Sequence, residues 1–264
     1  MFLNRFKTKQ CGVLIIDEEN GQRLTQKQLK LLGLTEDLNI HVLPLAGFTL
    51  TEETIEMIIN YCKEHDLKLV IFDSLVRIHN EDENSASEMR KVFKLLRILT
   101  INGLTVICTH HNRKQGLGSN SPSQALRGSS DILASVDCHI AIERKQKEGI
   151  INVRQTKLRN REEITPFKVN VISENDSLVF EYAGELDEAE DKKDNCKELI
   201  RELLETEGKA MYKQEVFNKL KESKKLTAGY GTFKQAVKEM VAEKLLFEHK
   251  GEKNKVFISL EASY

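Results

Sequence analysis

The sequence predicts an α/β protein with a mainly parallel sheet, followed by a small helical module. In the first half of the chain, short and wholly apolar runs alternate with segments whose apolar residues recur at helical spacing. Strands that are apolar throughout are typical of a parallel sheet covered by helices on both faces. Beyond residue 194, three helical segments precede two strands.

Four apolar runs in the first half predict the strands of the parallel sheet. The runs follow one another with helical segments between them, the second of which begins at Thr51, a suitable N-cap with Glu52 and Glu53 in its first turn. Gly33 is a plausible C-cap for the first helix. The expected strands are 13–16, 40–45, 69–73 and 104–109, and the expected helices are 23–33, 51–65 and 85–102.

Strand-like segments separated by short turns follow residue 137, and they predict an antiparallel extension of the sheet. Residues 184–194 show no apolar period and read as a linker. The expected helices at 195–207, 211–222 and 231–244, with two strands around the turn "GEKN", follow the order of a winged helix. We therefore expect an α/β core over 1–183, a linker over 184–194 and a winged-helix domain over 195–264.

The composition is that of a globular protein that is not held to nucleic acid by bulk charge. Charged residues make up 31% of the chain and the formal net charge is −1, which leaves room for local basic patches. No apolar run approaches the ~20 residues of a membrane helix, so we expect no membrane association. The five cysteines form no C-x-x-C pair, which favours a reducing cytoplasm.

Polar and acidic residues follow three of the predicted strands. Asp17, Glu18 and Glu19 come after the first strand, Asp73 after the third, and Thr109, His110 and His111 after the fourth. In parallel α/β sheets ligands bind at the carboxyl ends of the strands. A phosphoryl-transfer site needs a carboxylate near Mg²⁺, a group that orients the attacking water, and a polar group near the γ-phosphate.

These segments resemble the RecA-like ATPases, in particular hexameric helicases of the DnaB and RepA type. "VLIIDEENGQRL" is similar to the strand bearing the catalytic glutamate, which implies Glu19 with Glu18 second. "LVIFDSLVRI" resembles the Walker B strand, which implies Asp73 as the ligand of Mg²⁺ through water, and "TVICTHHNRK" resembles the sensor strand, which implies His110. The resemblance extends over roughly residues 1–172 and implies ATP and Mg²⁺ as cofactors.

The same resemblance implies a hexameric ring of identical subunits that acts on single-stranded DNA. "VRQTKLRNREEI" resembles the strand whose Lys157 and Arg159 reach a neighbouring subunit's ATP site. The Gly/Ser-rich loop 112–130, with Arg113, Lys114 and Arg127, matches the family's channel loop, and its charge suits a nucleic-acid backbone. In the winged helix, the residues expected to contact DNA are Tyr230, Lys234 and Lys238.

Each motif also has a purely structural interpretation. Asp17–Asn20 suit the capping of the following helix, Asp73 suits a turn after a buried strand, and the two histidines suit core or surface positions. Adjacent strand residues point to opposite faces, so both histidines cannot ligate one metal ion from a regular strand. The loop 112–130 suits a flexible surface segment, and many winged helices bind proteins.

No G-x-x-x-x-G-K-[ST] phosphate-binding loop occurs in the chain. We expect the first strand, the P-loop and its helix to be missing from the core. Three explanations stay open: a reading frame that starts late at an internal Met, which we favour; a P-loop on a separate chain; or a degenerate fold. We therefore expect a helicase-type ATPase that hydrolyses little ATP as this chain and is poorly soluble; the alternative is a non-catalytic DNA-binding or regulatory protein that uses the winged helix.

Overall fold

The chain divides into two compact units, the first ending at Gly184 and the second running from Glu185 to Tyr264. The computed structural model describes residues 1–35, 37–111, 130–145, 149–174, 177–223, 225–251 and 255–261. The predicted loop residues Arg113, Lys114 and Arg127 lie outside the described residues.

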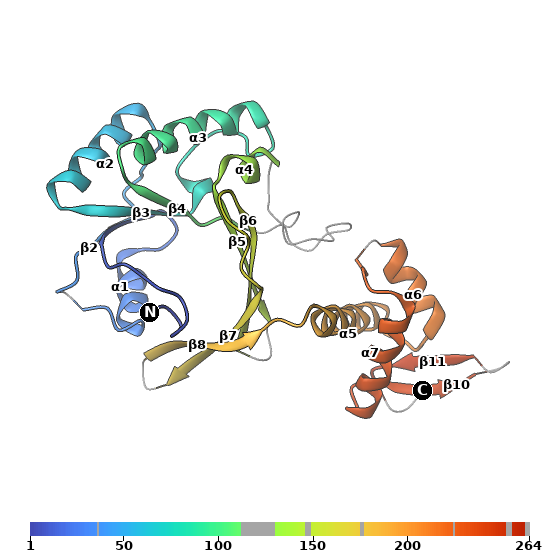
Figure 1. The fold of residues 1–264 in the computed structure, drawn as a ribbon. Coiled ribbons are helices and arrows are strands. Elements are labelled where there is room, and N and C mark those ends of the chain that lie inside the picture. Colours follow the sequence, from blue (N-terminus) through green and yellow to red (C-terminus); the bar gives the residue numbers. More distant parts are fainter. Residues whose placement is uncertain are drawn as a thin grey trace. The chain divides into compact units, whose positions relative to one another are not determined.

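A four-stranded parallel sheet forms the first part of unit 1 (Figure 1), in the order β2-β1-β3-β4. Its strands are β1 (Gly12–Asp17), β2 (Ile40–Pro44), β3 (Leu67–Asp73) and β4 (Thr105–Cys108), and its helices are α1 (Gln22–Leu31), α2 (Glu52–Glu64) and α3 (Ala86–Ile101), with a short 3₁₀ turn, η1 (Leu75–Arg77). A mixed α/β arrangement around such a sheet fits a nucleotide-binding fold, as the sequence predicted.

Local sequence explains where these elements begin and end. Thr51 caps α2, because its hydroxyl accepts a hydrogen bond from Thr54 N–H while the Thr54 side chain bonds back to Thr51 N–H. Gly33, which follows the end of α1, has φ of 73°, a left-handed conformation that only glycine adopts at little cost. Strand β1 ends where Asp17 turns its carboxylate into the following loop.

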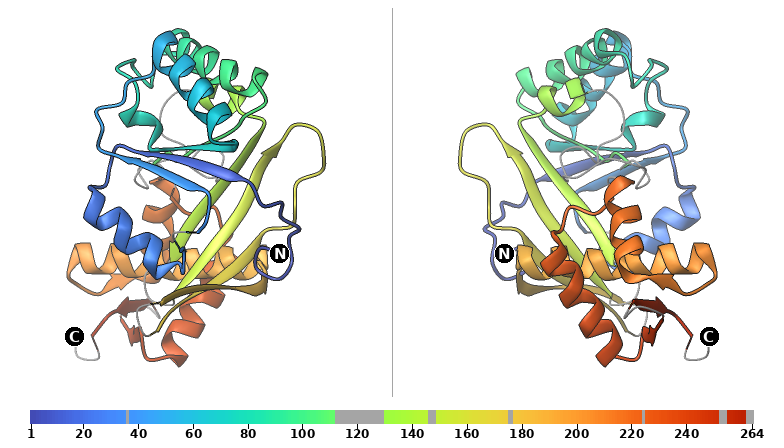
Figure 2. Two further views of the ribbon diagram at one scale, coloured as in Figure 1. Left: turned by 90° about the vertical axis from the view of Figure 1, so that its left-hand side faces the viewer. Right: turned by 90° about the vertical axis from the view of Figure 1, so that its right-hand side faces the viewer.

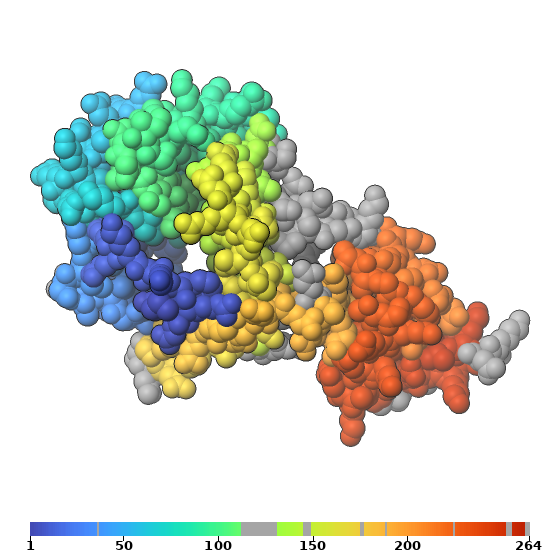
Figure 3. Space-filling view, in the orientation of Figure 1, coloured from blue at the N-terminus to red at the C-terminus, as the bar shows by residue number. Residues whose placement is uncertain are grey.

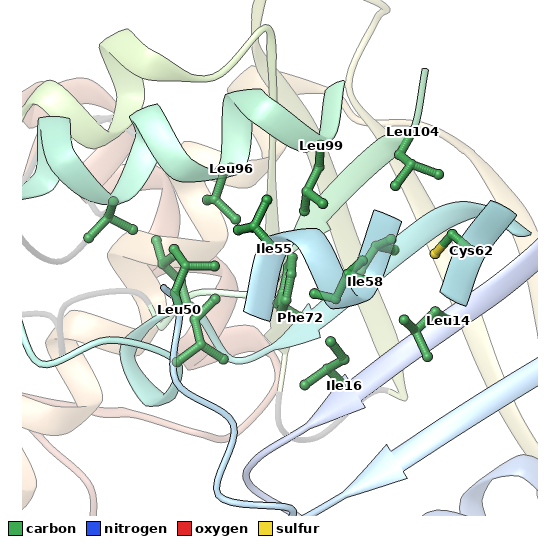
Figure 4. Close-up of a cluster of buried hydrophobic side chains, with 14 of the residues drawn as sticks. Leu14, Ile16, Leu50, Ile55, Ile58, Cys62, Phe72, Leu96, Leu99 and Leu104 are labelled. Atoms are coloured by element: carbon green, nitrogen blue, oxygen red, sulfur yellow. The ribbon is translucent and has the colours of Figure 1, made fainter. Parts of the chain in front are cut away.

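The main core of unit 1 lies on one face of the parallel sheet, under α2 and α3. Figure 4 shows Ile16 and Phe72 of the sheet close to Ile55 and Ile58 of α2, and all four are buried. The opposite face, which bears alternate residues such as Ile15 and Ile71, has α1 on its side (Figure 2) and is only half-buried. The two faces of the sheet are therefore unequally covered.

Strands β5 to β8 form a second sheet, in the order β5-β6-β7-β8, with antiparallel pairing of β5 with β6 and of β6 with β7. They are β5 (Cys138–Lys145), β6 (Ile150–Leu158), β7 (Phe167–Glu174) and β8 (Ser177–Glu185), preceded by α4 (Ser130–Ser135). The prediction that these strands extend the parallel sheet is wrong. Within the described ranges β4 pairs with β3 alone and β5 with β6 alone, so no strand joins the two sheets.

The N-terminal segment packs on this second sheet (Figure 3). Phe6 lies with its ring 5.2 Å from that of Phe167 on β7, and Arg5 Nη1 donates to the Tyr182 hydroxyl on β8 at 2.7 Å. Aromatic contacts of this length add specific packing beyond the burial of area. The first residues of the chain are thus part of unit 1.

Unit 2 has the order helix, strand, helix, helix and two strands. Its elements are α5 (Glu188–Glu207), β9 (Met211–Tyr212), α6 (Lys213–Glu222), α7 (Tyr230–Ala242), β10 (Phe247–Lys250) and β11 (Val256–Ser259). The strands form one sheet in the order β10-β11-β9. Its core includes Ile200, Phe233, Leu246 and Ile258, all fully buried.

The predicted linker at 184–194 is wrong for most of its length, because α5 begins at Glu188 with Asp187 as its N-cap. The first turns of α5 lack an apolar stripe, but Lys193 and Lys197 pair with Glu239 of α7 at 2.8 and 2.9 Å. Contacts between helices far apart in the sequence therefore extend the helix. Among the described helices of both units, none has the length and apolar character that a membrane crossing requires.

Candidate active site

The three acidic residues after β1 have three different surroundings. Asp17 is buried, and its carboxylate accepts hydrogen bonds from the N–H groups of Glu19 and Asn20 at 3.0 and 2.8 Å and from the Thr25 hydroxyl at 3.1 Å. These contacts stabilise the loop between β1 and α1, whereas the predicted capping of the helix is wrong, because the N-cap of α1 is Gly21 and it has no side-chain hydrogen bond. Asp17 shapes the loop and leads into α1.

Glu18, the second candidate for catalysis, is bonded to the loop after β2. Its carboxylate accepts hydrogen bonds from three successive backbone N–H groups, those of Ala46, Gly47 and Phe48, at 2.9 to 3.2 Å. Backbone N–H groups in such a run form a nest for an anion. Glu18, the neighbour of Glu19, therefore holds the loop after β2 in position.

Glu19 is the carboxylate of this group that faces the neighbouring strand tips. Its Oε1 accepts hydrogen bonds from the Ser74 hydroxyl at 2.5 Å and from His111 Nε2 at 3.1 Å. The hydrogen bond from Ser74, together with the hydrogen bond and the charge of His111, lowers the pKa of Glu19 below its ordinary value. Glu19 is thus a carboxylate at neutral pH, with Oε2 unbonded within the described part of the chain.

Asp73 ends β3 next to this group. Its Oδ1 accepts a hydrogen bond from the Thr109 hydroxyl at 2.5 Å, and its backbone oxygen accepts one from Glu18 N–H at 2.7 Å. The backbone contact links the tips of β1 and β3, and the side-chain contact links those of β3 and β4. Oδ2 of Asp73 stays available to a water of a hydrated cation, the kind of contact that Mg²⁺ favours because it keeps several waters.

The side chains of the two histidines after β4 have different partners. His111 approaches Glu19, as above, whereas His110 turns inward and lies 2.8 Å from Glu83 Oε1, in the loop before α3. The sequence predicted that His110 would lie in the site. In the structure it is His111, and not His110, that contacts Glu19. Alternation along a strand separates neighbouring residues, but it does not tell which of the two faces the site.

Glu83 and Ser74 are the site residues that sequence reasoning missed. Ser74 directly follows Asp73, so its closeness to the site was readable from the motif, although its hydrogen bond to Glu19 was not. Glu83 carries no local signal, because it lies in a polar loop and meets His110 only through the fold. Within the described residues, no group of three or more His, Cys, Asp and Glu side chains is arranged to hold a metal ion by itself.

Lys157 and Arg159, predicted to reach a neighbouring subunit, contact α4 of their own chain. Lys157 Nζ donates to the carbonyl oxygens of Leu133 and Ala134 at 2.7 and 3.0 Å. Arg159 donates to the Ala134 carbonyl at 3.2 Å and pairs with Asp137 at 2.9 Å. Cations are favourable at the carbonyl end of a helix, so both side chains support α4 in this structure.

On α7, the residues predicted to contact DNA fall into two groups. Lys234 and Lys238 are exposed, and neither forms an ion pair with a described residue. Tyr230 packs its ring against Phe217 and Phe233, with centroids 4.9 and 5.9 Å away, and Lys234 Nζ lies 5.2 Å from the Tyr230 centroid. The tyrosine therefore orients a lysine and is itself half-buried.

Comparison with known families agrees with this geometry. Residues 1–116 match a family model described as "AAA domain", which supports an ATPase domain of the P-loop, RecA-like class over this part of the chain. The matched stretch includes the tips of β1, β3 and β4, where Glu19, Asp73 and His111 lie. A search of curated proteins found no match to the chain.

Proposed function

We propose that unit 1 is the core of a RecA-like ATPase of the DnaB and RepA helicase type that acts on single-stranded DNA. The observation that carries this proposal is the meeting of Glu19, Asp73 and His111 at the tips of three adjacent parallel strands. A carboxylate base, a carboxylate for a hydrated cation and a polar sensor are the groups that phosphoryl transfer to water requires.

In this proposal each residue has one task. Glu19, held as a carboxylate by Ser74, orients and deprotonates the attacking water through its unbonded oxygen. Asp73, oriented by the Thr109 hydroxyl, holds a cation-bound water, and His111 lies where it can donate to a phosphate oxygen. Mg²⁺, when bound with ATP, neutralises the charge that develops on the transferred phosphoryl group.

The 264 residues hold no phosphate-binding loop, so we propose that a strand–loop–helix segment outside them completes the site. Support comes from β4, whose outer edge has no partner within the described residues, and from Ile107 on that strand, which is 46% exposed. Parallel strands are normally paired and covered on both faces. An added strand beside β4 would place a glycine-rich loop near Asp73, and a helix after it would cover Ile107.

We further propose that the protein works as a ring of identical subunits. Lys157 and Arg159 would then leave α4 and complete the neighbour's ATP site. The loop that contains Arg113, Lys114 and Arg127 would follow the DNA backbone. Their charge is the feature that supports both roles.

Unit 2 is proposed to be a winged-helix domain that binds DNA. The order α5-β9-α6-α7-β10-β11 and the sheet β10-β11-β9 support this assignment, with α7 as the helix presented to DNA. Lys234 and Lys238 would contact phosphates, while Tyr230 holds Lys234 in place through its ring. Substitution of both lysines by Glu is then expected to weaken binding to any DNA sequence and to reduce its salt dependence.

A non-catalytic DNA-binding or regulatory protein is the second candidate, favoured by the absence of a phosphate-binding loop together with the unpaired lysines of α7. Reading the coding DNA upstream of the Met1 codon for an in-frame G-x-x-x-x-G-K-[ST] motif is the cheapest discriminating observation. A chain extended by that segment is then titrated with Mg·ATP in a calorimeter. We expect binding that weakens in Asp73→Asn; no binding by the extended chain would leave the second candidate.

A further inference from the structure

Two consecutive residues that follow β4, His110 and His111, have opposite environments. Both ring nitrogens of His110 face oxygen atoms: Nε2 lies 2.8 Å from Glu83 Oε1 and Nδ1 lies 2.9 Å from the backbone oxygen of His111. A carbonyl oxygen only accepts, and a carboxylate does likewise, so a proton is needed on each nitrogen. A ring that holds both protons would form an ion pair with Glu83.

This ion pair is buried. The side chains of His110 and Glu83 are 8% and 9% exposed. Burial of charge is tolerated only where the charges are paired and hydrogen-bonded. The pKa values of two further histidines, His79 and His139, are lowered by burial. Electrostatic interaction with His110 lowers both further, while Glu83 raises the pKa of His79.

The pair also fixes the backbone of the next residue. The second proton of His110 is donated to the carbonyl of His111 itself, and the ring that donates it is anchored on Glu83. Thr109 on the other side is bonded to Asp73. Residues 109, 110 and 111 are thus held by three carboxylates, those of Asp73, Glu83 and Glu19 in turn.

We propose that the Glu83–His110 ion pair is a positioning device that holds His111 against Glu19. The link runs from Glu83 through the His110 ring and the His111 carbonyl to the imidazole that donates to Glu19. The catalytic meaning of this link rests on the proposed function, but the link itself does not.

The test is imidazole ¹⁵N NMR on the full chain labelled at histidine. Glu19→Gln removes the carboxylate that His111 contacts, so it is expected to shift the His111 Nε2 signal. The size of that shift is measured in three backgrounds: the parent chain, Glu83→Gln, and Glu81→Gln. Glu81 is the matched control, since it lies in the same loop and pairs with Lys91 at 3.5 Å.

We expect the shift to be unchanged in Glu81→Gln and at least twofold smaller in Glu83→Gln, because His111 is then no longer held at Glu19. An equal shift in both backgrounds would overturn the proposal. If Glu83→Gln does not fold, the parent chain decides by itself: two N–H protons on the His110 ring at neutral pH support the ion pair, and a single one refutes it. None of these readouts needs nucleotide, so their failure is separate from a failure to hydrolyse ATP.

Discussion

The two units of the molecule differ in how completely they bury their apolar strands. In unit 2, helices and sheet enclose a core in which Phe233, Val237, Leu246 and Ile258 are fully buried. In unit 1, Ile140 and Ile142 on the edge strand β5 are 51% and 57% exposed, and the edge strand β4 of the parallel sheet has no partner beyond β3 in the described ranges. Unit 2 has the form of a self-contained domain, whereas unit 1 presents edges that suit a further strand.

The largest expected effect concerns the core of unit 2. Phe233→Ala removes a fully buried ring and is expected to lower the free energy of unfolding of unit 2 by about 3–5 kcal/mol. The matched control is Leu245→Ala, because Leu245 is apolar but 53% exposed and its truncation leaves no cavity. Urea unfolding of both variants, followed by signals from unit 2, measures the difference; equal losses would show that this core is not closed.

The buried ion pair gives the next effect, in unit 1. Glu83→Gln leaves the His110 charge without a counter-charge, and we expect a loss of about 3 kcal/mol in the free energy of unfolding. The comparison is Lys219→Gln in unit 2, where the pair with Glu207 is more exposed and screened by solvent, so that the loss is expected to be much smaller. Urea midpoints of the two variants test this, and a larger loss for Lys219→Gln would refute it.

Acid is expected to affect the units at different pH. Burial is the main cause that lowers the folded-state pKa of His79 and of His139. On acidification the unfolded chain therefore binds protons before the folded chain does. Unit 1 is expected to lose stability as the pH falls below about 6.5. In unit 2 the contacts with Lys193 and Lys197 lower the pKa of Glu239 to about 2, so its contribution is lost as pH falls from 4.5 towards 2.

Unit-specific NMR signals in urea at several pH values follow both transitions in one sample. Unit 1 should lose stability first on acidification, and Glu239→Gln should flatten the lower transition of unit 2 alone. Simultaneous loss in both units above pH 5 would contradict this assignment of the groups.

The smallest expected effect on stability is at the exposed edge of unit 1. Ile140→Lys is expected to change the free energy of unfolding by less than about 0.5 kcal/mol, because the side chain is exposed. Solubility should rise, since a lysine on an edge strand opposes edge-to-edge association. Light scattering at matched concentration measures the association, and a strongly destabilised variant would show that this edge is already covered in the folded chain.

The order of helices and strands in unit 1 was predictable because buried parallel strands and amphipathic helices leave local patterns. Which of Asp17, Glu18 and Glu19 faces the candidate site was only partly predictable. Glu18 is held by N–H groups of residues 46–48, which no local pattern around Glu18 reveals. Its partner comes from the packing of the loop after β2 against the tip of β1.

Two other differences have the same origin in long-range contacts. His111 and His110 are chemically alike and adjacent, so local sequence does not tell which of them turns inward, where the structure places Glu83. The start of α5 has little apolar pattern, and it is supported by charge pairs with α7 that a window of local sequence does not contain. Local periodicity predicts elements, whereas the partners of charged side chains are set by tertiary structure.

We propose that the tips of β1, β3 and β4 form an ATP hydrolysis site, which a phosphate-binding segment completes. The most direct test is the rate of ATP hydrolysis by the 264-residue chain with and without a strand–loop–helix segment bearing G-x-x-x-x-G-K-[ST] joined ahead of Met1. We predict background turnover without the segment and clear turnover with it, falling about 10²–10⁴-fold in Glu19→Gln but little in the neighbouring Glu18→Gln. Robust turnover by the 264 residues alone that is lost in Glu19→Gln, or turnover by the extended chain that Glu19→Gln does not change, would contradict the claim.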